Sequence, residues 1–206
     1  MRIGIDFDNT IVSYDSVFHR VALEKELIPA DLTVSKLSVR DHLRRAGLEQ
    51  TWIEMQGYVY GARMDDAAFY PGVLDFLRWG RESGIEMFII SHKTKHPFAG
   101  PQYDLHQAAR SWVNKHLSDG AKPYLPVDAV FFELTKDAKL ARIASLRCDV
   151  FIDDLPEIIE APAFPPAAEG ILFDPDGHHL DSKLARVQNW QQLRQRIDQK
   201  IARTAS

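Results

Sequence analysis

The sequence of 206 residues has very little cysteine, because Cys148 is the only one. A single cysteine cannot form an internal disulfide, which excludes a small secreted domain built on disulfide bonds. No stretch approaches the roughly 20 consecutive apolar residues that a membrane-spanning helix needs. The N-terminus also lacks the charged and apolar regions of a secretory signal peptide. We therefore expect a protein of the cytoplasm without a membrane partner.

An excess of basic residues is absent as well. The chain has 25 Lys and Arg against 29 Asp and Glu, and its net charge is −4. This balance provides no broad basic surface for a nucleic-acid polymer, although a small anion can still bind where the local charge is positive. Hydrophobic residues make up 45% and charged residues 26% of the chain, which is typical of a soluble globular enzyme. The composition leaves the oligomeric state unknown.

A short apolar segment at the N-terminus ends in two carboxylates. Residues 2–5 have the pattern of a buried strand, and Asp6 and Asp8 follow directly. Alternate side chains of an extended chain point to the same side, so both acids can face the end of a sheet. Two carboxylates this close repel each other unless a cation or a shared proton lies between them. Mg²⁺ suits this position because it prefers oxygen ligands and often accompanies phosphate.

Residues 6–10, Asp-Phe-Asp-Asn-Thr, resemble the first motif of the haloacid dehalogenase-like (HAD) hydrolase superfamily, Asp-x-Asp-x-Thr. The resemblance implies that Asp6 is a nucleophile that accepts a phosphoryl group as an aspartyl-phosphate. It implies that Asp8 is the general acid for the leaving group and then the base for water. An acid at this second position resembles the phosphatases of the superfamily, because the dehalogenases lack it. Asn9 and Thr10 are expected to bind substrate.

The second polar strand end follows residues 85–90, a continuous apolar run that ends at Ser91. It resembles the second HAD motif, in which a hydroxyl hydrogen-bonds the transferred phosphoryl group. His92 and Lys93 come next and are expected to bind the substrate, since donors near a strand end can stabilise its charge. The alternative for both is a solvated polar loop.

The third polar strand end is the pair Asp153 and Asp154, which follows a strand pattern at 149–152 and a preceding helix. This order resembles the third and fourth HAD motifs. The resemblance implies a site lysine on the helix, and its spacing to the acids favours Lys139. Lys136 remains the alternative, because residues three positions apart share a helical face. Asp153 corresponds to a direct Mg²⁺ ligand and Asp154 to a second or outer ligand. The expected metal ligands are therefore Asp6, Asp8, Asp153 and Asp154.

Two further clusters compete with this interpretation. His92, His96 and His106 could suggest zinc, but no cysteine or Glu-x-x-His partner supports it. Asp174 and Asp176 repeat the Asp-x-Asp spacing after another strand pattern. Their Asp-Pro and Asp-Gly sequences are typical of a turn, so we predict a turn there and not a catalytic pair.

Helix and strand patterns alternate along most of the chain, which predicts an α/β fold. The resemblance implies a Rossmann-like three-layer core with a mostly parallel sheet of about five strands. Sites in such sheets form at the carboxyl ends of the strands. Residues 14–70 have helical patterns only and resemble the small all-helical cap of many HAD enzymes. The expected domains are thus a core at 1–13 and 71–206 and a cap insertion at 14–70.

The cap segment contributes four arginines that can meet a phosphate or an acidic substrate group, or can simply be solvated. They are Arg40, Arg44, Arg45 and Arg63.

Together the motifs predict a Mg²⁺-dependent phosphomonoester phosphatase that acts through an aspartyl-phosphate on a small phosphorylated metabolite. A nucleotide 5′-phosphatase is an alternative, because the Asp-Asp pair resembles that of some nucleotidases. A phosphate- or nucleotide-binding module on a non-catalytic HAD core is another. A third is transfer of the phosphoryl group to an acceptor other than water.

Overall fold

The computed structural model describes residues 1–120 and 122–204, which form two compact units. Unit 1 consists of Met1–Ile11, Phe69–His92 and the described part of Asp119–Ser206. Unit 2 consists of Val12–Ala68 and Lys93–Ser118. Residues 14–68 of the predicted insertion at 14–70 lie in unit 2, and its last two residues, 69 and 70, lie in unit 1. Residues 93–118, which we had assigned to the core, group with unit 2 as well.

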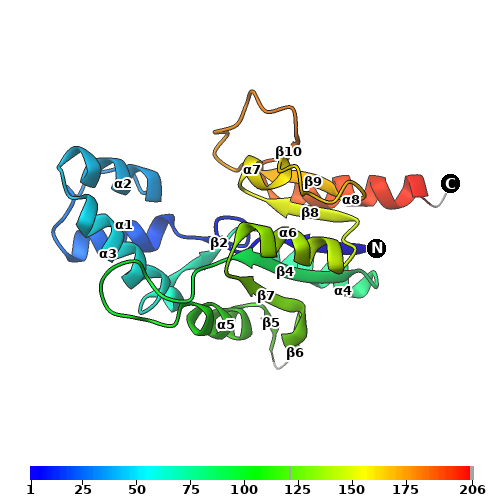
Figure 1. Ribbon diagram of the computed structural model, residues 1–206, viewed down its shortest axis with the longest axis horizontal. Helices are drawn as coiled ribbons and strands as arrows, with labels where there is room; N and C mark the ends of the chain where they lie inside the picture. Colours follow the sequence, from blue (N-terminus) through cyan, green and yellow to red (C-terminus); the bar gives the residue numbers. More distant parts are fainter. Residues whose placement is uncertain (121, 205–206) are drawn as a thin grey trace. The chain divides into compact units, whose positions relative to one another are not determined.

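Unit 1 is built on one sheet that has six strands in the described part of the chain (Figure 1). The strands lie in the order β10-β9-β8-β1-β4-β7, and every neighbouring pair is parallel. Their bounds are β1 Arg2–Ile5, β4 Glu86–His92, β7 Val130–Glu133, β8 Val150–Asp153, β9 Glu169–Phe173 and β10 Ala185–Val187. The strand that carries the first motif is therefore internal, between β4 and β8.

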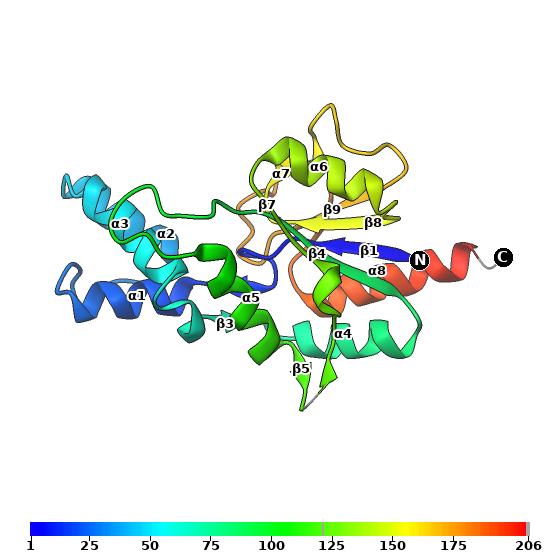
Figure 2. The same cartoon turned by 60° about the horizontal axis from the view of Figure 1, so that its bottom comes forward.

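Helices cover both faces of this sheet, as Figure 2 shows. On one face lie α4 (Val73–Glu82) and α8 (Trp190–Thr204), which contact each other. On the other lie α6 (Lys136–Ser145) and α7 (Pro156–Ile159). The predicted three-layer α/β core is thus confirmed. A further small sheet pairs β5 (Ser118–Asp119) with β6 (Lys122–Pro123).

Two strands of the sheet are short. β7 begins only at Val130, because Val127–Ala129 forms a 3₁₀ turn after Pro126. The edge strand β10 was missed altogether. It has only three residues, and Arg186 occupies its middle, so no apolar run marks it in the sequence.

The packing around β1 explains the glycine within it. A Cβ atom at Gly4 would lie 2.7 Å from a ring carbon of Phe151 and 3.0 Å from Sγ of Cys148. Phe151 and Cys148 belong to a buried apolar cluster that also includes Ile143 of α6. Gly4 therefore leaves room for the aromatic ring of Phe151 on β8 to lie directly against β1.

Unit 2 is mainly helical. It contains α1 (Asp15–Glu24), α2 (Lys36–Arg45), α3 (Glu49–Tyr60) and α5 (Leu105–His116), together with a 3₁₀ turn at Met64–Asp66. Ser35 begins α2 by accepting hydrogen bonds from the N–H groups of Leu37 and Ser38. Edge-to-face and tilted aromatic contacts join α1 to α3 through Tyr14, Phe18, Trp52 and Tyr60.

Two short strands, β2 (Val12–Ser13) and β3 (Ala68–Phe69), pair with each other. Among the residues that the structure describes, no helix combines the length and the apolar character that crossing a membrane requires.

Candidate active site

The site is built around Asp6, which follows the last residue of β1. Its N–H donates to the carbonyl of Ile152 at 2.8 Å, which continues the pairing of β1 with β8 by one step. This bond places Asp6 beside Asp153, the last residue of β8. Only 4% of Asp6 is exposed. The carboxylate is therefore held in a largely dehydrated position at the carboxyl edge of the sheet.

Ser91 reaches the same carboxylate from the neighbouring strand. It is buried near the end of β4, which pairs with β1, and its hydroxyl hydrogen-bonds the side chain of Asp6. β4 extends to His92, so the strand continues one residue beyond Ser91, where we expected it to end. The regular pairing of β4 gives Ser91 a fixed position against Asp6.

Lys139 supplies the positive charge of the site. Its Nζ lies 2.6 Å from Oδ1 of Asp6 and 2.6 Å from Oδ2 of Asp153, and only 2% of its side chain is exposed. Thr135 begins α6 by accepting a hydrogen bond from the N–H of Ala138, which sets the start of the helix one turn before the lysine. Lys139 thus joins the ends of β1 and β8 through one buried ammonium group.

The alternative lysine lies elsewhere. Nζ of Lys136 is 3.0 Å from a carboxylate oxygen of Glu157 on α7, and about half of each side chain is exposed. Both lysines are on α6, but only Lys139 points to the carboxylates. The geometry therefore assigns Lys136 to a surface ion pair.

The two acids after β8 have different surroundings. Asp153 is completely buried, and its two oxygens contact the N–H of Leu155 at 3.0 Å and Nζ of Lys139. Asp154 is only partly buried, and its Oδ2 accepts a hydrogen bond of 3.3 Å from the amide of Asn9. Asp154 is thus closer to solvent than Asp153, which already has a lysine and a backbone partner.

Burial and charge together perturb the pKa values of these groups. Burial raises the pKa of Asp6 and the nearby Asp8 adds to it, while Lys139 and Ser91 act in the opposite direction. Burial and the charge of Asp6 raise the pKa of Asp153 to about 7, again against Lys139. Burial alone would lower the pKa of Lys139, but Asp6 and Asp153 outweigh it and raise that pKa above its usual value. Lys139 thus reduces the rise in the pKa of Asp6 and Asp153 but does not cancel it.

The donor set fits a hard divalent cation. Carboxylate oxygens of Asp6, Asp153 and Asp154 lie within 4.8 Å of one another. Mg²⁺ prefers such oxygen ligands, and a second cation would oppose the burial and the repulsion that together raise the pKa of Asp6 and Asp153. Asp8, the fourth predicted ligand, is not part of this group of oxygens in the described residues.

The remaining predicted contact residues have mixed positions. His92 is partly buried at the end of β4. Thr10 is completely buried, and its hydroxyl has no hydrogen-bond partner among the residues described. Lys93 belongs to unit 2, where its Nζ lies 4.9 Å from the centre of the Tyr60 ring. Of the predicted site residues, the structure thus brings Asp6, Ser91, Lys139 and Asp153 into direct contact.

The competing clusters have structural roles. His106 hydrogen-bonds the carbonyl of Lys93, and His96 that of Tyr103. Within the described residues, the group of three acids is the only set of His, Cys, Asp or Glu with metal-binding geometry. Asp174 accepts hydrogen bonds from the N–H groups of His178 and His179 and pairs with Arg186, so it anchors its own loop.

The four cap arginines also have partners within unit 2. Arg40 pairs with Asp41, and Arg45 donates to the carbonyl of the same residue. Arg44 pairs with Glu49, and Arg63 pairs with both Glu24 and Asp66. These contacts favour the interpretation of the arginines as surface residues.

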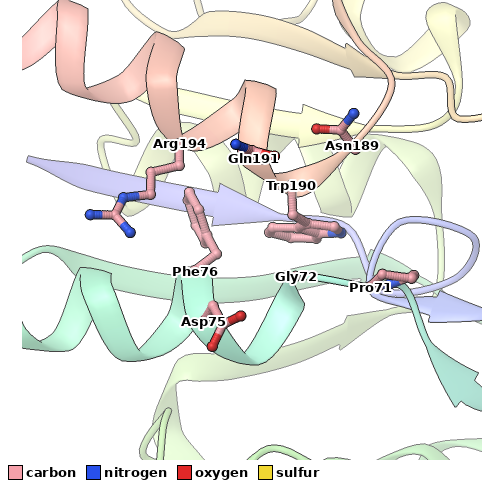
Figure 3. Close-up of a pocket in the computed structure, with 8 residues that line it drawn as sticks. All are labelled: Pro71, Gly72, Asp75, Phe76, Asn189, Trp190, Gln191 and Arg194. Atoms are coloured by element: carbon pink, nitrogen blue, oxygen red, sulfur yellow. The ribbon is translucent and has the colours of Figure 1, made fainter.

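A hollow of about 390 Å³ lies elsewhere in unit 1, beside the first turns of α4 and α8 (Figure 3). Its lining includes the aromatic rings of Phe76 and Trp190 and the side chains of Asp75 and Arg194. It contains no residue that the motifs single out.

Comparisons with known proteins address the fold. No family model matches the chain, and no curated protein does. Solved structures do match. A HAD-superfamily hydrolase from Ehrlichia chaffeensis has a TM-score of 0.59 at 16% identity, and the match covers 97% of each chain. A predicted phosphatase from Clostridium acetobutylicum has a TM-score of 0.59 at 15% identity and covers 96% of this chain and 98% of that chain.

A HAD family hydrolase from Deinococcus radiodurans R1, with bound phosphate and sodium, has a TM-score of 0.58 at 15% identity. That match covers 96% of this chain and 95% of the other. The sheet and its helices therefore have the fold of the HAD-like hydrolase superfamily. The predicted resemblance to that superfamily is confirmed at the level of the fold.

Proposed function

We propose that this protein is a Mg²⁺-dependent phosphomonoester phosphatase that acts through an aspartyl-phosphate on a small phosphorylated metabolite. The observation that carries the proposal is the convergence of Ser91, Lys139 and Asp153 on the carboxylate of Asp6. These residues come from three strands and one helix, and a buried carboxylate that remains ionised needs partners such as Lys139 and Ser91. The HAD-like fold supports the same class of reaction.

In the first step, a carboxylate oxygen of Asp6 attacks the phosphorus atom and the bond from phosphorus to the ester oxygen breaks. The leaving oxygen takes a proton from Asp8, which begins the step protonated. Lys139 and Ser91 stabilise the negative charge on the phosphoryl oxygens. This positioned charge stabilisation is the main catalytic contribution in phosphoryl transfer.

In the second step, Asp8 takes a proton from a water molecule while that water attacks the phosphorus of the aspartyl-phosphate. The bond between Asp6 and phosphorus breaks, inorganic phosphate leaves, and both acids return to their starting forms. Asp8 thus serves as acid and base in turn, and the net reaction consumes one water.

The proposed metal ligands are Asp6, Asp153 and Asp154, whose oxygens lie within 4.8 Å of one another, whereas Asp8 acts as the acid and the base. Mg²⁺ bound there would supply positive charge to the phosphoryl oxygens and to the carboxylates around them. Of the two acids after β8, Asp154 is more exposed to solvent, whereas the oxygens of Asp153 already contact Lys139 and Leu155. We therefore propose Asp154 as the more direct ligand, with Asp153 holding Lys139.

The proposed substrate contacts are Thr10, His92 and Lys93, as the sequence predicts. The substrate is a small phosphorylated molecule, and no nucleic-acid polymer or membrane takes part. A location in the cytoplasm remains a prediction from the single cysteine.

The first test is hydrolysis of a panel of phosphomonoesters, with Mg²⁺ and then with chelator, by the wild type and the Asp6→Asn protein. We expect metal-dependent release of phosphate that the substitution abolishes. Asp128→Asn, at an exposed acid of unit 1, is the matched control and should retain full activity. Full activity of the Asp6→Asn protein would contradict the proposal.

A second measurement separates the alternatives. Mass spectrometry of the Asp8→Asn protein with substrate should detect a phosphoryl adduct on Asp6, since the substitution slows its hydrolysis. Turnover restricted to nucleotides would indicate a nucleotide 5′-phosphatase. Phosphate found on an added alcohol would indicate transfer. Binding of phosphate without turnover of any ester would indicate a binding module.

A further inference from the structure

Asn9 has an unusual backbone conformation for its place in the site. Its φ angle is +56°, in the left-handed region, and it shares a positive φ with only Glu26 and Arg147 among the non-glycine residues described. Asparagine tolerates this region better than most residues do. Glu26 and Arg147 both lie just after helices, where a left-handed residue is common. Asn9 lies instead within the first motif, in the loop between β1 and β2, so helix termination does not explain its conformation.

The side chain of Asn9 joins two loops that are far apart in the sequence. Its Nδ2 donates to Oδ2 of Asp154 at 3.3 Å, a contact across 145 positions. One loop follows β1 and the other follows β8, and these strands are neighbours in the sheet. An oxygen of Asp154 lies within 4.8 Å of oxygens of Asp6 and Asp153. The amide of Asn9 thus hydrogen-bonds Asp154, one of the three acids of the candidate metal site.

Asp154 differs from Asp153 in how it is held. Asp153 is fixed by Lys139 and by the N–H of Leu155 inside the protein. Asp154 is partly exposed, so its carboxylate has more rotational freedom unless a neighbour orients it. A residue that hydrogen-bonds a metal ligand often affects metal affinity, and its mutation typically lowers that affinity about 10-fold or more.

We propose that Asn9 is a positioning residue of the metal site, whose left-handed backbone directs its amide at Asp154 and holds that carboxylate toward Asp6 and Asp153. The inference rests on the metal in the proposed function, and it replaces the substrate contact that the sequence suggested for Asn9. It also separates two roles of one residue: the backbone sets the loop, and the amide orients the ligand.

The two roles can be tested separately. Asn9→Gly keeps access to positive φ and removes the amide, whereas Asn9→Ala removes the amide and strains the backbone. We expect Asn9→Gly to weaken binding of Mg²⁺ and Mn²⁺ roughly 10-fold, measured by calorimetry and by the electron paramagnetic resonance of free Mn²⁺. Its unfolding temperature should remain near that of the wild type. Arg147→Gly, at another positive φ in unit 1, is the matched control and should bind metal normally.

A double-mutant cycle shows whether Asn9 acts through Asp154. In an Asp154→Ala background, Asn9→Gly should cause no further loss of metal affinity. If Asp154→Ala binds too little metal to measure, the crystal structure of the Asn9→Gly protein decides instead. A rotated Asp154 carboxylate would support the proposal, and an unchanged one would overturn it.

Two results would overturn the inference while leaving the proposed function intact. One is normal metal affinity in the Asn9→Gly protein. The other is the same loss of affinity with and without Asp154, which would mean that Asn9 acts by another route. If the wild type binds no metal, both this inference and the proposed metal site are wrong. Hydrolysis of phosphomonoesters in the presence of chelator would then show whether the phosphatase proposal survives.

Discussion

Lys139 has an environment that few lysines have, since it is buried between two carboxylates at 2.6 Å each. Taking a charged group out of water is costly, so the three residues are stable only as a set. Removing the ammonium group leaves two acids close together without a cation. The proposed reaction needs this same positive charge at the phosphoryl group. Stability and catalysis therefore both depend on the ammonium group of Lys139.

Lys139→Met should therefore lower the free energy of unfolding by about 3–5 kcal/mol and reduce turnover by roughly 100-fold or more. Chemical denaturation and phosphate release measure the two effects. Lys136→Met is the matched control on the same helix. Its exposed ion pair with Glu157 is expected to contribute less than about 1 kcal/mol. Equal effects of the two substitutions would contradict this assignment of the lysines.

Asp174 provides a pH-dependent test outside the site. Burial alone would raise its pKa, but the N–H groups of His179 and His178 and the side chain of Arg186 lower it below the usual value. A carboxyl group with a lower pKa in the folded state stabilises the protein above its unfolded pKa of about 3.9. That contribution is lost as the pH falls through the lower, folded value.

We expect Asp174→Asn to cost about 2–4 kcal/mol at pH 7, because charge-assisted hydrogen bonds are lost. The difference from the wild type should stay constant down to about pH 5 and shrink as the pH falls below about 4. Urea unfolding at a series of pH values measures it. A difference that grows on acidification would have the wrong sign for this mechanism.

At the scale of elements, strand ends were more predictable than strand lengths. The polar residues after apolar runs located Asp6, Ser91 and Asp153 correctly at one edge of a parallel sheet. Sites in open parallel sheets generally form at the carboxyl ends of the strands, so the order of the elements was enough to predict where these residues lie. Strand β10 was missed because three residues with a central arginine have no hydrophobic pattern.

The grouping of Lys93–Ser118 with unit 2 was also not foreseen. Helix α5 has an apolar stripe like any helix that covers a sheet, and its periodicity does not tell which surface the stripe meets. Nor could the contact of Asn9 with Asp154 be predicted. It depends on one left-handed φ angle and on side-chain orientation, neither of which the spacing of the motifs encodes.

The contact between Gly4 of β1 and the Phe151 ring on β8 gives a prediction at this scale. Gly4→Ala adds a methyl group 2.7 Å from the Phe151 ring, which forces a shift between two strands that carry the site. We expect a loss of about 1–3 kcal/mol in the free energy of unfolding, measured in urea. Adding Phe151→Leu should make the pair of substitutions less destabilising than the sum of the two. Strict additivity would mean that the ring does not limit the space at Gly4.

For the molecule as a whole, the acidic residues that the motifs predict as metal ligands all come from unit 1. In the folded state of this unit, Asp6 and Asp153 are buried close together. Their burial and the neighbouring acids raise the pKa of both groups. A divalent cation that binds this arrangement and not the unfolded chain must stabilise the folded state by mass action. Stability should therefore report metal binding even when no substrate is known.

Mg²⁺ at 100 times its dissociation constant should stabilise the protein by about 2.7 kcal/mol. For a chain of this size, that corresponds to a rise in unfolding temperature of roughly 5–10 °C. Differential scanning calorimetry with Mg²⁺, with chelator, and with NaCl at equal ionic strength measures the effect. Asp154→Ala should abolish most of the shift, whereas Asp128→Asn should retain it. An equal shift with NaCl would point to general screening of the net charge of −4 and not to a site.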